Sequence, residues 1–268
     1  MLEQITSRQN ETVKIHAKLL QSAARRREAG QFLCEGARLC RDAAESGIVI
    51  DTFYATASAY EKYGAYCQKI ASVAKRSYQI SDHVAPLLSD TKHPQGVFCV
   101  CRLPAQAHSL ETLEKDKSYL ALEQMQDPSN FGTVLRTAEA LGIKGVFLCG
   151  PCCDPFGPKA LRGSMGAVFR LPLFFCQDGP SAAKQLGEKG FATFASVVDS
   201  SAQPVTSADF SGPSVLFIGN EGNGLTENCV TSCDHRITIP MLGRAESLNA
   251  SAATSILLWE MMRDKGAM

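Results

Sequence analysis

Apolar and polar residues alternate along the chain in short blocks, a pattern that predicts an α/β protein. Over residues 7–28 the apolar side chains Val13, Ile15, Leu19 and Leu20 recur among lysines and arginines, which is typical of an amphipathic helix that Gly30 would end. We expect strands to follow at 31–34, 48–54, 78–80 and 96–101, with helices at 35–46 and 58–74. This alternation predicts a small α/β module in residues 1–104.

A second alternation follows a change of composition near residue 104. Pro104, His108 and mixed charges with few large apolar groups predict a linker over residues 105–117. Beyond it we expect strands at 118–123, 145–148, 171–175, 191–197, 214–218 and 236–239, and helices at 132–141, 159–164, 181–189, shortly after 225 and at 247–263. Strands that alternate with helices predict a parallel sheet in residues 118–268, with a ligand site beyond the carboxyl ends of its strands.

The composition is that of a globular protein. Of the 268 residues, 45% are hydrophobic and 20% are charged, and no apolar run approaches the roughly 18 residues that cross a bilayer. The first residues include an acid where a signal peptide carries bases. We therefore expect a cytoplasmic protein with no membrane partner, and eleven cysteines that are reduced thiols.

Charge divides unevenly between the two modules. Residues 1–104 hold 14 Lys and Arg against 10 Asp and Glu, whereas residues 105–268 hold 13 against 17. The sharpest cluster is Arg25, Arg26 and Arg27, which follow Lys14 and Lys18 in the first helical stretch. A basic module before an acidic one suits a protein whose first part contacts a polyanion and whose second part does chemistry. A solvated helix face is the alternative explanation of the cluster.

The common nucleotide fingerprints are missing from the sequence. There is no G-x-G-x-x-G after a strand and no G-x-x-x-x-G-K-[ST], so neither the usual NAD site nor a P-loop is favoured. Instead, three polar loops follow predicted strands. In the first, from Asp127 to Ala138, Asp-Pro predicts a turn and Asn130 a helix cap. Because Arg136 lies one turn after Gly132, we expect both to face whatever binds at the strand end, and the alternative for Arg136 is a surface ion pair.

The second loop, Gly219 to Gly224, directly follows an apolar strand. Its three glycines permit positive φ angles and let a ligand approach the backbone closely, and Glu221 offers one carboxylate at the strand end. A carboxylate there disfavours a phosphate ligand. A hairpin turn is the alternative, although a hairpin needs fewer glycines.

The third stretch, residues 239–251, precedes the last predicted helix. We expect Ser247 to cap this helix, and a plain capped helix without a site is the alternative. The helix has more apolar residues than one core-facing stripe requires: Ile256, Leu257, Leu258, Trp259, Met261 and Met262. This surplus predicts a second buried face, either within the chain or in a homodimer with Trp259 or the methionines as contacts.

Together the three loops resemble the SpoU (TrmH-like) family of the SPOUT superfamily, RNA ribose 2′-O-methyltransferases that use S-adenosylmethionine. The first loop is similar to the family's N-x-G-x-x-x-R-x-A motif, the second to G-x-E-x-x-G-[LI], and the third to I-P-M-x-G-x-x-x-S-L-N-[VA]-S. The likeness covers residues 118–263 in the right order, with residues 159–167 similar to the family's helix before a short strand. Residues 1–104 resemble in layout the RNA-binding domain often fused in front, and residues 32–36 look like a stretch of it.

The resemblance implies an α/β methyltransferase domain tied in a deep trefoil knot, with S-adenosylmethionine held in the knot largely by backbone groups. It carries cofactor contacts over to Gly219, Ile239 and Leu248. It carries catalytic-site roles over to Asn130, Arg136, Glu221, Ser247 and Asn249. It further implies a homodimer packed through these domains and an RNA substrate, with 23S-type rRNA as the first choice and tRNA as the second. We expect no metal.

The implied chemistry constrains the role of the arginine. A ribose hydroxyl is a poor nucleophile at neutral pH, so its alkoxide must be stabilised. A guanidinium is effectively never deprotonated in proteins. We therefore expect Arg136 to act as a positioned cation for the developing oxyanion and the adjacent phosphate, with Glu221 and Asn130 orienting it.

Three alternatives come from other features of the chain. The C-G-P-C sequence at 149–152 matches thioredoxin-like oxidoreductases, but two nearby prolines break any helix that begins there. Cys229, Cys233 and His235 supply at most three metal ligands, with no second pair. A non-catalytic RNA-binding protein with the same fold is the third alternative, which the filled motif positions disfavour.

Overall fold

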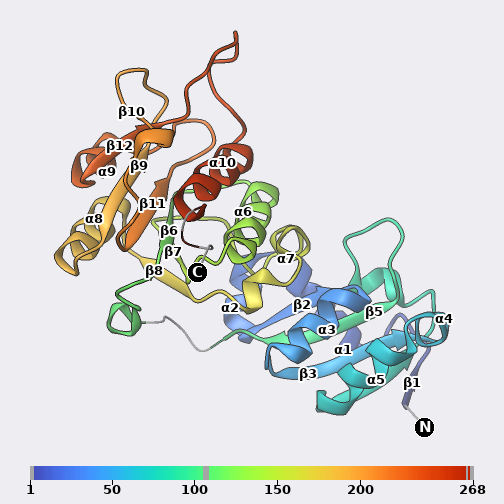
Figure 1. Cartoon of the computed structure of the whole chain (residues 1–268). Helices are drawn as coiled ribbons and strands as arrows, with labels where there is room; N and C mark the ends of the chain where they lie inside the picture. Colours follow the sequence, from blue (N-terminus) through green and yellow to red (C-terminus); the bar gives the residue numbers. More distant parts are fainter. Residues whose placement is uncertain (1–2, 105–108, 264, 266–268) are drawn as a thin grey trace. The chain divides into compact units, whose positions relative to one another are not determined.

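The chain forms two compact units in the computed structural model, which describes residues 3–104, 109–263 and 265. One unit comprises Met1–Ala105 together with Asp154–Arg170, and the other comprises Gln106–Cys153 together with Leu171–Met268. Residues 105–108 of the expected linker lie outside the described residues. Figure 1 follows the chain from end to end.

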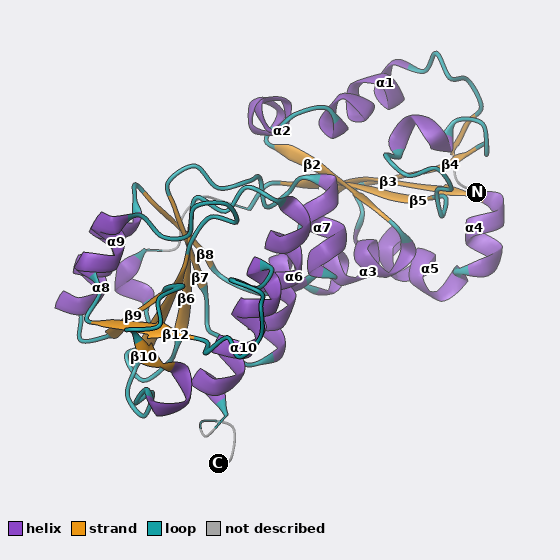
Figure 2. Cartoon of the chain, turned by 90° about the horizontal axis from the view of Figure 1, so that it is seen from above, coloured by secondary structure: helices purple, strands orange, loops and turns teal. Residues whose placement is uncertain are grey.

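The first unit is a five-stranded mixed sheet with helices α3, α4 and α5 on one side and α1 on the other (Figure 2). Its elements are β1 (Glu3–Ile5), α1 (Glu11–Ala17), α2 (Ala23–Ala29), β2 (Gln31–Glu35), α3 (Ala37–Glu45), β3 (Ile50–Thr56), α4 (Ala57–Lys62), α5 (Gly64–Val73), β4 (Arg76–Ile80), β5 (Val97–Arg102) and α7 (Pro158–Ser164). The strand order is β1-β4-β3-β5-β2, in which β5 runs antiparallel to both its neighbours. The predicted α/β character of this module is confirmed.

Local capping divides two helices that the pattern predicts as continuous. The predicted helix 7–28 is α1, a 3₁₀ turn at Lys18–Leu20 and then α2. Asn10 and Ser22 each accept a hydrogen bond from a backbone N–H three residues later, at 3.1 and 3.3 Å, and so start separate helices. The predicted helix 58–74 is α4 and α5, divided at Tyr63, whose φ of −120° and ψ of 31° are not helical. The short strand β1 was not predicted.

The arginine cluster of α2 is not a uniform basic surface. The side chain of Arg26 is only 7% exposed and donates from Nε to Asp154 at 2.6 Å. A second bond, also of 2.6 Å, runs from its Nη1 to the carbonyl of Leu19. Arg25 pairs at the surface with Glu28. One of the three cations is therefore a buried structural group that is not available at the surface.

The segment Asp154–Arg170 packs within the first unit although it interrupts the sequence of the second. The ring centroid of Phe156 lies 4.8 Å from that of Phe32 on β2, and Arg162 forms an ion pair with Asp90. The helix predicted at 159–164 is present as α7. Its apolar pattern could not show which sheet it covers, because a helix has the same pattern wherever it packs.

The second unit is a seven-stranded sheet between two helical layers: α8 and α9 cover one face, α6 and α10 the other (Figures 1 and 2). Its elements are β6 (Tyr119–Glu123), α6 (Pro128–Ala140), β7 (Val146–Cys149), β8 (Leu173–Cys176), α8 (Gly179–Glu188), β9 (Ala192–Ser196), β10 (Gln203–Pro204), β11 (Ser214–Ile218), α9 (Glu227–Ser232), β12 (His235–Thr238) and α10 (Ala250–Met262). The order is β10-β12-β9-β11-β6-β7-β8, with parallel pairing throughout. The predicted parallel sheet is confirmed.

The central strands β6 and β11 are buried on both faces because helices cover both. All residues of β6 and β11 are buried, which explains why these strands read as continuous apolar runs. Within the described ranges, no helix combines the length and the apolar character that crossing a membrane requires. The trefoil knot stays a prediction.

We predict that Asp154→Ala destabilises the protein by about 3 kcal/mol, because it leaves the buried Arg26 guanidinium without its carboxylate. Urea unfolding measures the loss. The matched control is Glu28→Ala, which breaks the exposed pair with Arg25 and should cost no more than about 0.5 kcal/mol. Equal effects of the two substitutions would contradict a structural role for the buried pair.

Candidate functional site

Two of the three motif loops meet at the carboxyl ends of β6 and β11, which are neighbouring parallel strands. The carboxylate of Glu221 accepts the backbone N–H groups of Gln126 at 3.1 Å and Asp127 at 3.0 Å. Asn220 Nδ2 donates to the carbonyl of Gln124 at 2.9 Å. The loop after β11 therefore holds the chain ahead of α6 through its backbone. Glu221 therefore contacts the backbone ahead of α6 and not Arg136, which we expected it to orient.

The loop after β11 closes on itself. The N–H and carbonyl groups of Asn220 and Gly224 bond reciprocally at 3.0 and 2.9 Å, which is the hairpin turn stated above as the alternative. A Cβ on Gly219 would lie 2.0 Å from the carbonyl carbon of Gly224, so this position cannot carry a side chain. Gly224 adopts a φ of +69°, which glycine tolerates best. Two of the three glycines are thus required by the turn itself.

A buried carboxylate anchors the far end of the same loop. Glu123, at the end of β6, is 2% exposed and accepts both the N–H of Thr226 at 2.8 Å and its hydroxyl at 2.9 Å. A Cβ on Gly179 would lie 2.5 Å from Glu123 Oε1, so a side chain at the start of α8 would displace this carboxylate. The sequence interpretation missed Glu123. The signal was an acid that ends an otherwise apolar strand.

The backbone between these contacts is strained. Gln124 has a φ of +53°, in the left-handed region that costs a non-glycine residue about 1 kcal/mol or more. Its N–H donates to the carbonyl of Cys149 at 3.0 Å. The turn leads the chain through the buried Met125 to the two N–H groups that Glu221 accepts. Bonds from two other strands thus hold a conformation that the local sequence does not favour.

The helix caps differ from the predicted ones. Asp127 Oδ1 accepts the N–H groups of Ser129 at 2.9 Å and Asn130 at 2.8 Å, so α6 begins at Pro128 and not at residue 132. Proline fits the first turn of a helix because no intrahelical partner exists there for its missing N–H. The predicted cap by Asn130 is therefore wrong.

At the last helix the predicted cap by Ser247 is also wrong. Asn249 caps α10, and its Oδ1 accepts the N–H and hydroxyl of Ser251 at 3.0 and 2.7 Å. The remaining group of this side chain, Nδ2, donates to Asn130 Oδ1 at 3.0 Å. Two candidate residues that lie 119 positions apart in sequence thus contact each other at the starts of α6 and α10.

Arg136 lies on the exposed side of α6. Its guanidinium forms no hydrogen bond or ion pair with any residue that the structure describes, so the alternative of a surface ion pair is not what is found. Gly132 is buried with the core-facing side of the helix, so it does not share a solvent face with Arg136 as predicted. The guanidinium is free to contact an external ligand.

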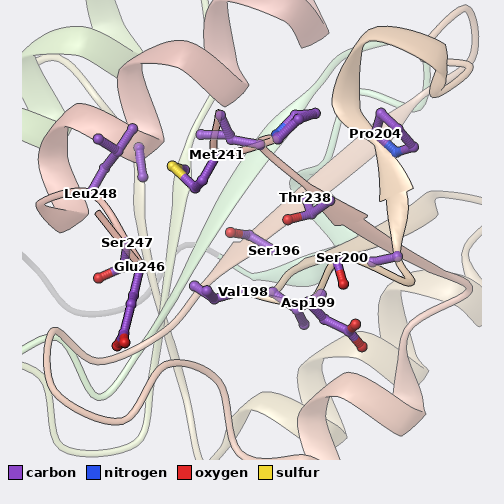
Figure 3. A pocket seen from close by; sticks show the side chains of 15 residues that line it. Ser196, Val198, Asp199, Ser200, Pro204, Thr238, Met241, Glu246, Ser247 and Leu248 are labelled. Atoms are coloured by element: carbon purple, nitrogen blue, oxygen red, sulfur yellow. The ribbon is translucent and has the colours of Figure 1, made fainter. Parts of the chain in front are cut away.

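The third motif stretch borders a pocket of about 490 Å³ (Figure 3). The predicted residues Ile239, Ser247 and Leu248 line it. Glu246 and Ser247 lie at one end of the view, and Asp199 and Ser200 lie toward the other. The volume suits a small organic ligand. The other predicted residues are not among the described residues that line this pocket: Gly219, Asn130, Arg136, Glu221 and Asn249.

The pocket is acidic. Of the described residues that line it, Asp199 and Glu246 carry carboxylates and none is basic. Asp199 accepts the N–H and hydroxyl of Ser201, both at 2.8 Å, and pairs with Arg236. The bonds from Ser201 and the charge of Arg236 lower the pKa of Asp199. Such a lining fits a cationic ligand better than a phosphate.

The structure disfavours the alternative of a thiol oxidoreductase with its site at residues 149–152. A hydrogen bond with Cys176 and burial raise the pKa of Cys149 far above its ordinary value, and burial raises the pKa of Cys152. A reactive thiol of an oxidoreductase needs a lowered pKa and a helix start, whereas here the next helix begins at Pro158. Among the described residues, no three His, Cys, Asp or Glu side chains gather to hold a metal ion.

Two family models match the chain, one on each side of the linker that the sequence predicts. A family model described as the SpoU rRNA Methylase family matches residues 117–259. A model described as an MRM3-like substrate binding domain matches residues 10–99.

Individual proteins resemble the chain over its whole length. An uncharacterized tRNA/rRNA methyltransferase of Synechocystis sp. is 33% identical over 98% of this chain and 94% of its own. The 23S rRNA (guanosine(2553)-2′-O)-methyltransferase of Bacillus subtilis is 29% identical over 97% of this chain and 99% of its own. The crystal structure of an AdoMet-bound rRNA methyltransferase from Sinorhizobium meliloti superposes with a TM-score of 0.86 at 28% identity, and 98% of each chain is covered.

We predict that Gly219→Ala lowers stability by at least about 2 kcal/mol, because the added methyl overlaps the backbone at Gly224. Urea unfolding in the absence of any ligand measures this loss. In the control, Gly187→Ala, the added methyl on α8 meets nothing within 4 Å, so stability should be unchanged or rise by about 0.5–1 kcal/mol. A stable Gly219→Ala protein would show that the loop does not need its close backbone approach.

Proposed function

The chain belongs to the SpoU rRNA methylase family, and we propose that this RNA methyltransferase transfers a methyl group from S-adenosylmethionine to a ribose 2′-hydroxyl of rRNA. The observation that carries the proposal is the bond between Asn130 and Asn249. It joins the starts of two motif helices next to a pocket that Ser247 and Leu248 line. The name of the Bacillus subtilis relative, a 23S rRNA 2′-O-methyltransferase, supports the choice of substrate.

The pocket suits the cofactor in size and in charge. Apolar side chains such as Ile239, Met241 and Leu248 offer surface to a nucleoside, and the carboxylates complement a ligand that carries positive charge. We assign Ile239 and Leu248 to cofactor binding, with Gly219 in the adjoining loop. When bound, S-adenosylmethionine supplies an electrophilic methyl group on a sulfonium centre.

The chain's own residues prepare the ribose oxygen for attack. Arg136 offers an exposed and unpaired cation to the developing oxyanion and to the neighbouring phosphate. Asn130, Asn249 and Ser247 provide polar groups that orient the ribose at the helix starts. Glu221 acts by fixing the backbone ahead of α6, which keeps the helix with Arg136 in place relative to β11.

The first unit supplies the RNA contacts in this proposal. The substrate-binding family model covers residues 10–99 of this unit. Its exposed cations that form no pair with described residues include Arg8, Lys18 and Arg27. Contacts of this kind with phosphates make the affinity for RNA fall as salt rises.

The direct test is methyl transfer from labelled S-adenosylmethionine to 23S rRNA that lacks modification, with tRNA as the comparison. Label should enter rRNA and make one internucleotide bond resistant to alkali, because a 2′-O-methyl group removes the attacking hydroxyl. Label on a base would contradict ribose methylation. Cofactor binding without transfer to either RNA would favour the non-catalytic alternative.

We predict that Arg136→Ala lowers the rate of methyl transfer by about 10²- to 10³-fold and changes cofactor affinity by less than about threefold, because the charge acts on the RNA oxyanion. Single-turnover kinetics and calorimetry measure the two quantities. Lys184→Ala removes an exposed cation from α8 and should leave both unchanged. Near wild-type turnover of Arg136→Ala would remove this residue from the mechanism.

A homodimer packed through the second unit is part of the proposal. On α10, Leu257, Leu258 and Met261 are buried within the chain, whereas Ile256 is 40% and Trp259 57% exposed. Met261 is therefore unavailable to a partner, and the contact falls to Ile256 and Trp259. A second copy would cover this apolar face.

We predict that light scattering gives twice the chain mass of 28.9 kDa for the native protein and a mass near 28.9 kDa for Trp259→Glu. The substitution puts a charge on the exposed apolar face, where burial would be costly. The control is Ile15→Glu, because Ile15 is 58% exposed and belongs to the first unit, whereas α10 belongs to the second. A native mass near 28.9 kDa would contradict the dimer.

A further inference from the structure

The two carboxylates of the pocket are not equivalent. Asp199 is satisfied within the protein, because two groups of Ser201 and the guanidinium of Arg236 already bond to it. Glu246 is exposed and has no hydrogen-bond or ion-pair partner among the described residues. Its negative charge is therefore the one in the pocket lining that remains available to a ligand.

Glu246 also lies beside residues of the third motif, at one end of the pocket. It immediately precedes Ser247 and is three positions before Asn249, whose side chain bonds to Asn130 at the start of α6. Figure 3 shows Glu246 and Ser247 together at one end of the pocket, away from Asp199. If RNA is oriented by Asn130 and Asn249, the group that gives up its methyl must bind at this end.

On these grounds, and resting on the proposed function, we infer that Glu246 selects the charged methyl donor over its neutral product. The donor carries a positive charge on its sulfonium sulfur. Loss of the methyl group leaves a neutral thioether in S-adenosylhomocysteine, while the ribose, the base and the amino acid end stay the same. A carboxylate at the sulfonium end stabilises only the donor, which helps the product to leave.

The expected size of this preference follows from electrostatics. Opposite unit charges a few ångströms apart at a wet surface attract with an energy that changes affinity by about three- to tenfold. Exposure of Glu246 keeps the effect at this level, because water screens the pair. A preference of this size is readily measured by calorimetry and needs no catalytic turnover.

The experiment compares the binding of three ligands to the full chain before and after Glu246→Gln. S-adenosylmethionine should bind about three- to tenfold more weakly to the variant, and S-adenosylhomocysteine should bind within about twofold of its native affinity. Sinefungin carries an ammonium group in place of the methylated sulfonium. Its affinity for the variant should fall as the affinity for the donor does. Glu246→Asp keeps the charge and should keep most of the preference.

The matched control is Glu227→Gln, which removes an exposed carboxylate from the first turn of α9 outside the pocket. It should alter none of the three affinities, and thermal unfolding checks that each variant folds. Equal weakening of donor and product, or no change in either, would overturn the inference. If the native chain bound neither donor nor product, the proposed function itself would fail. If the native chain bound both and Glu246→Gln had the same affinities, only the inference about Glu246 would fail.

Discussion

The arrangement of the second unit depends on how the backbone N–H groups at the end of β6 are satisfied. A strand that ends before a helix leaves backbone N–H groups that the sheet no longer pairs. Here the neighbouring strand supplies the acceptor, because Glu221 takes the N–H groups of Gln126 and Asp127. In return, Glu123 at the end of β6 takes both donors of Thr226. Each strand end thus holds the loop of the other.

This exchange explains features that look unrelated in sequence. Gln124 can keep a left-handed backbone because bonds on both sides hold it. Gly219 has no room for a side chain because the loop returns directly over it. Since Asp127 caps α6, the side chain of Asn130 is released to meet Asn249. Polar groups that could serve a substrate are therefore held by residues whose own role is to fix the backbone.

Pairing within the protein also decides which charged side chains remain available at the surface. Arg26 belongs by sequence to a basic cluster, yet it is buried against Asp154 and is lost to the surface. Asp199 lines an acidic pocket, yet its carboxylate is already bonded to Ser201 and Arg236. The charges left without partners, such as those of Arg136 and Glu246, are the ones available to RNA and cofactor. A charge count along the chain cannot distinguish these two classes.

The sequence by itself determined the α/β class, the parallel sheet and the family, because hydrophobic periodicity and three ordered motifs are local signals. It also brought Asn130 and Asn249 forward as candidates. It could not give the helix starts, since Asp127, Asn130, Ser247 and Asn249 are all residue types that can cap a helix, and only three-dimensional geometry decides which of them does. Which sheet α7 covers and which acceptor Glu221 serves were likewise decided by tertiary structure, because those partners lie far apart in the chain.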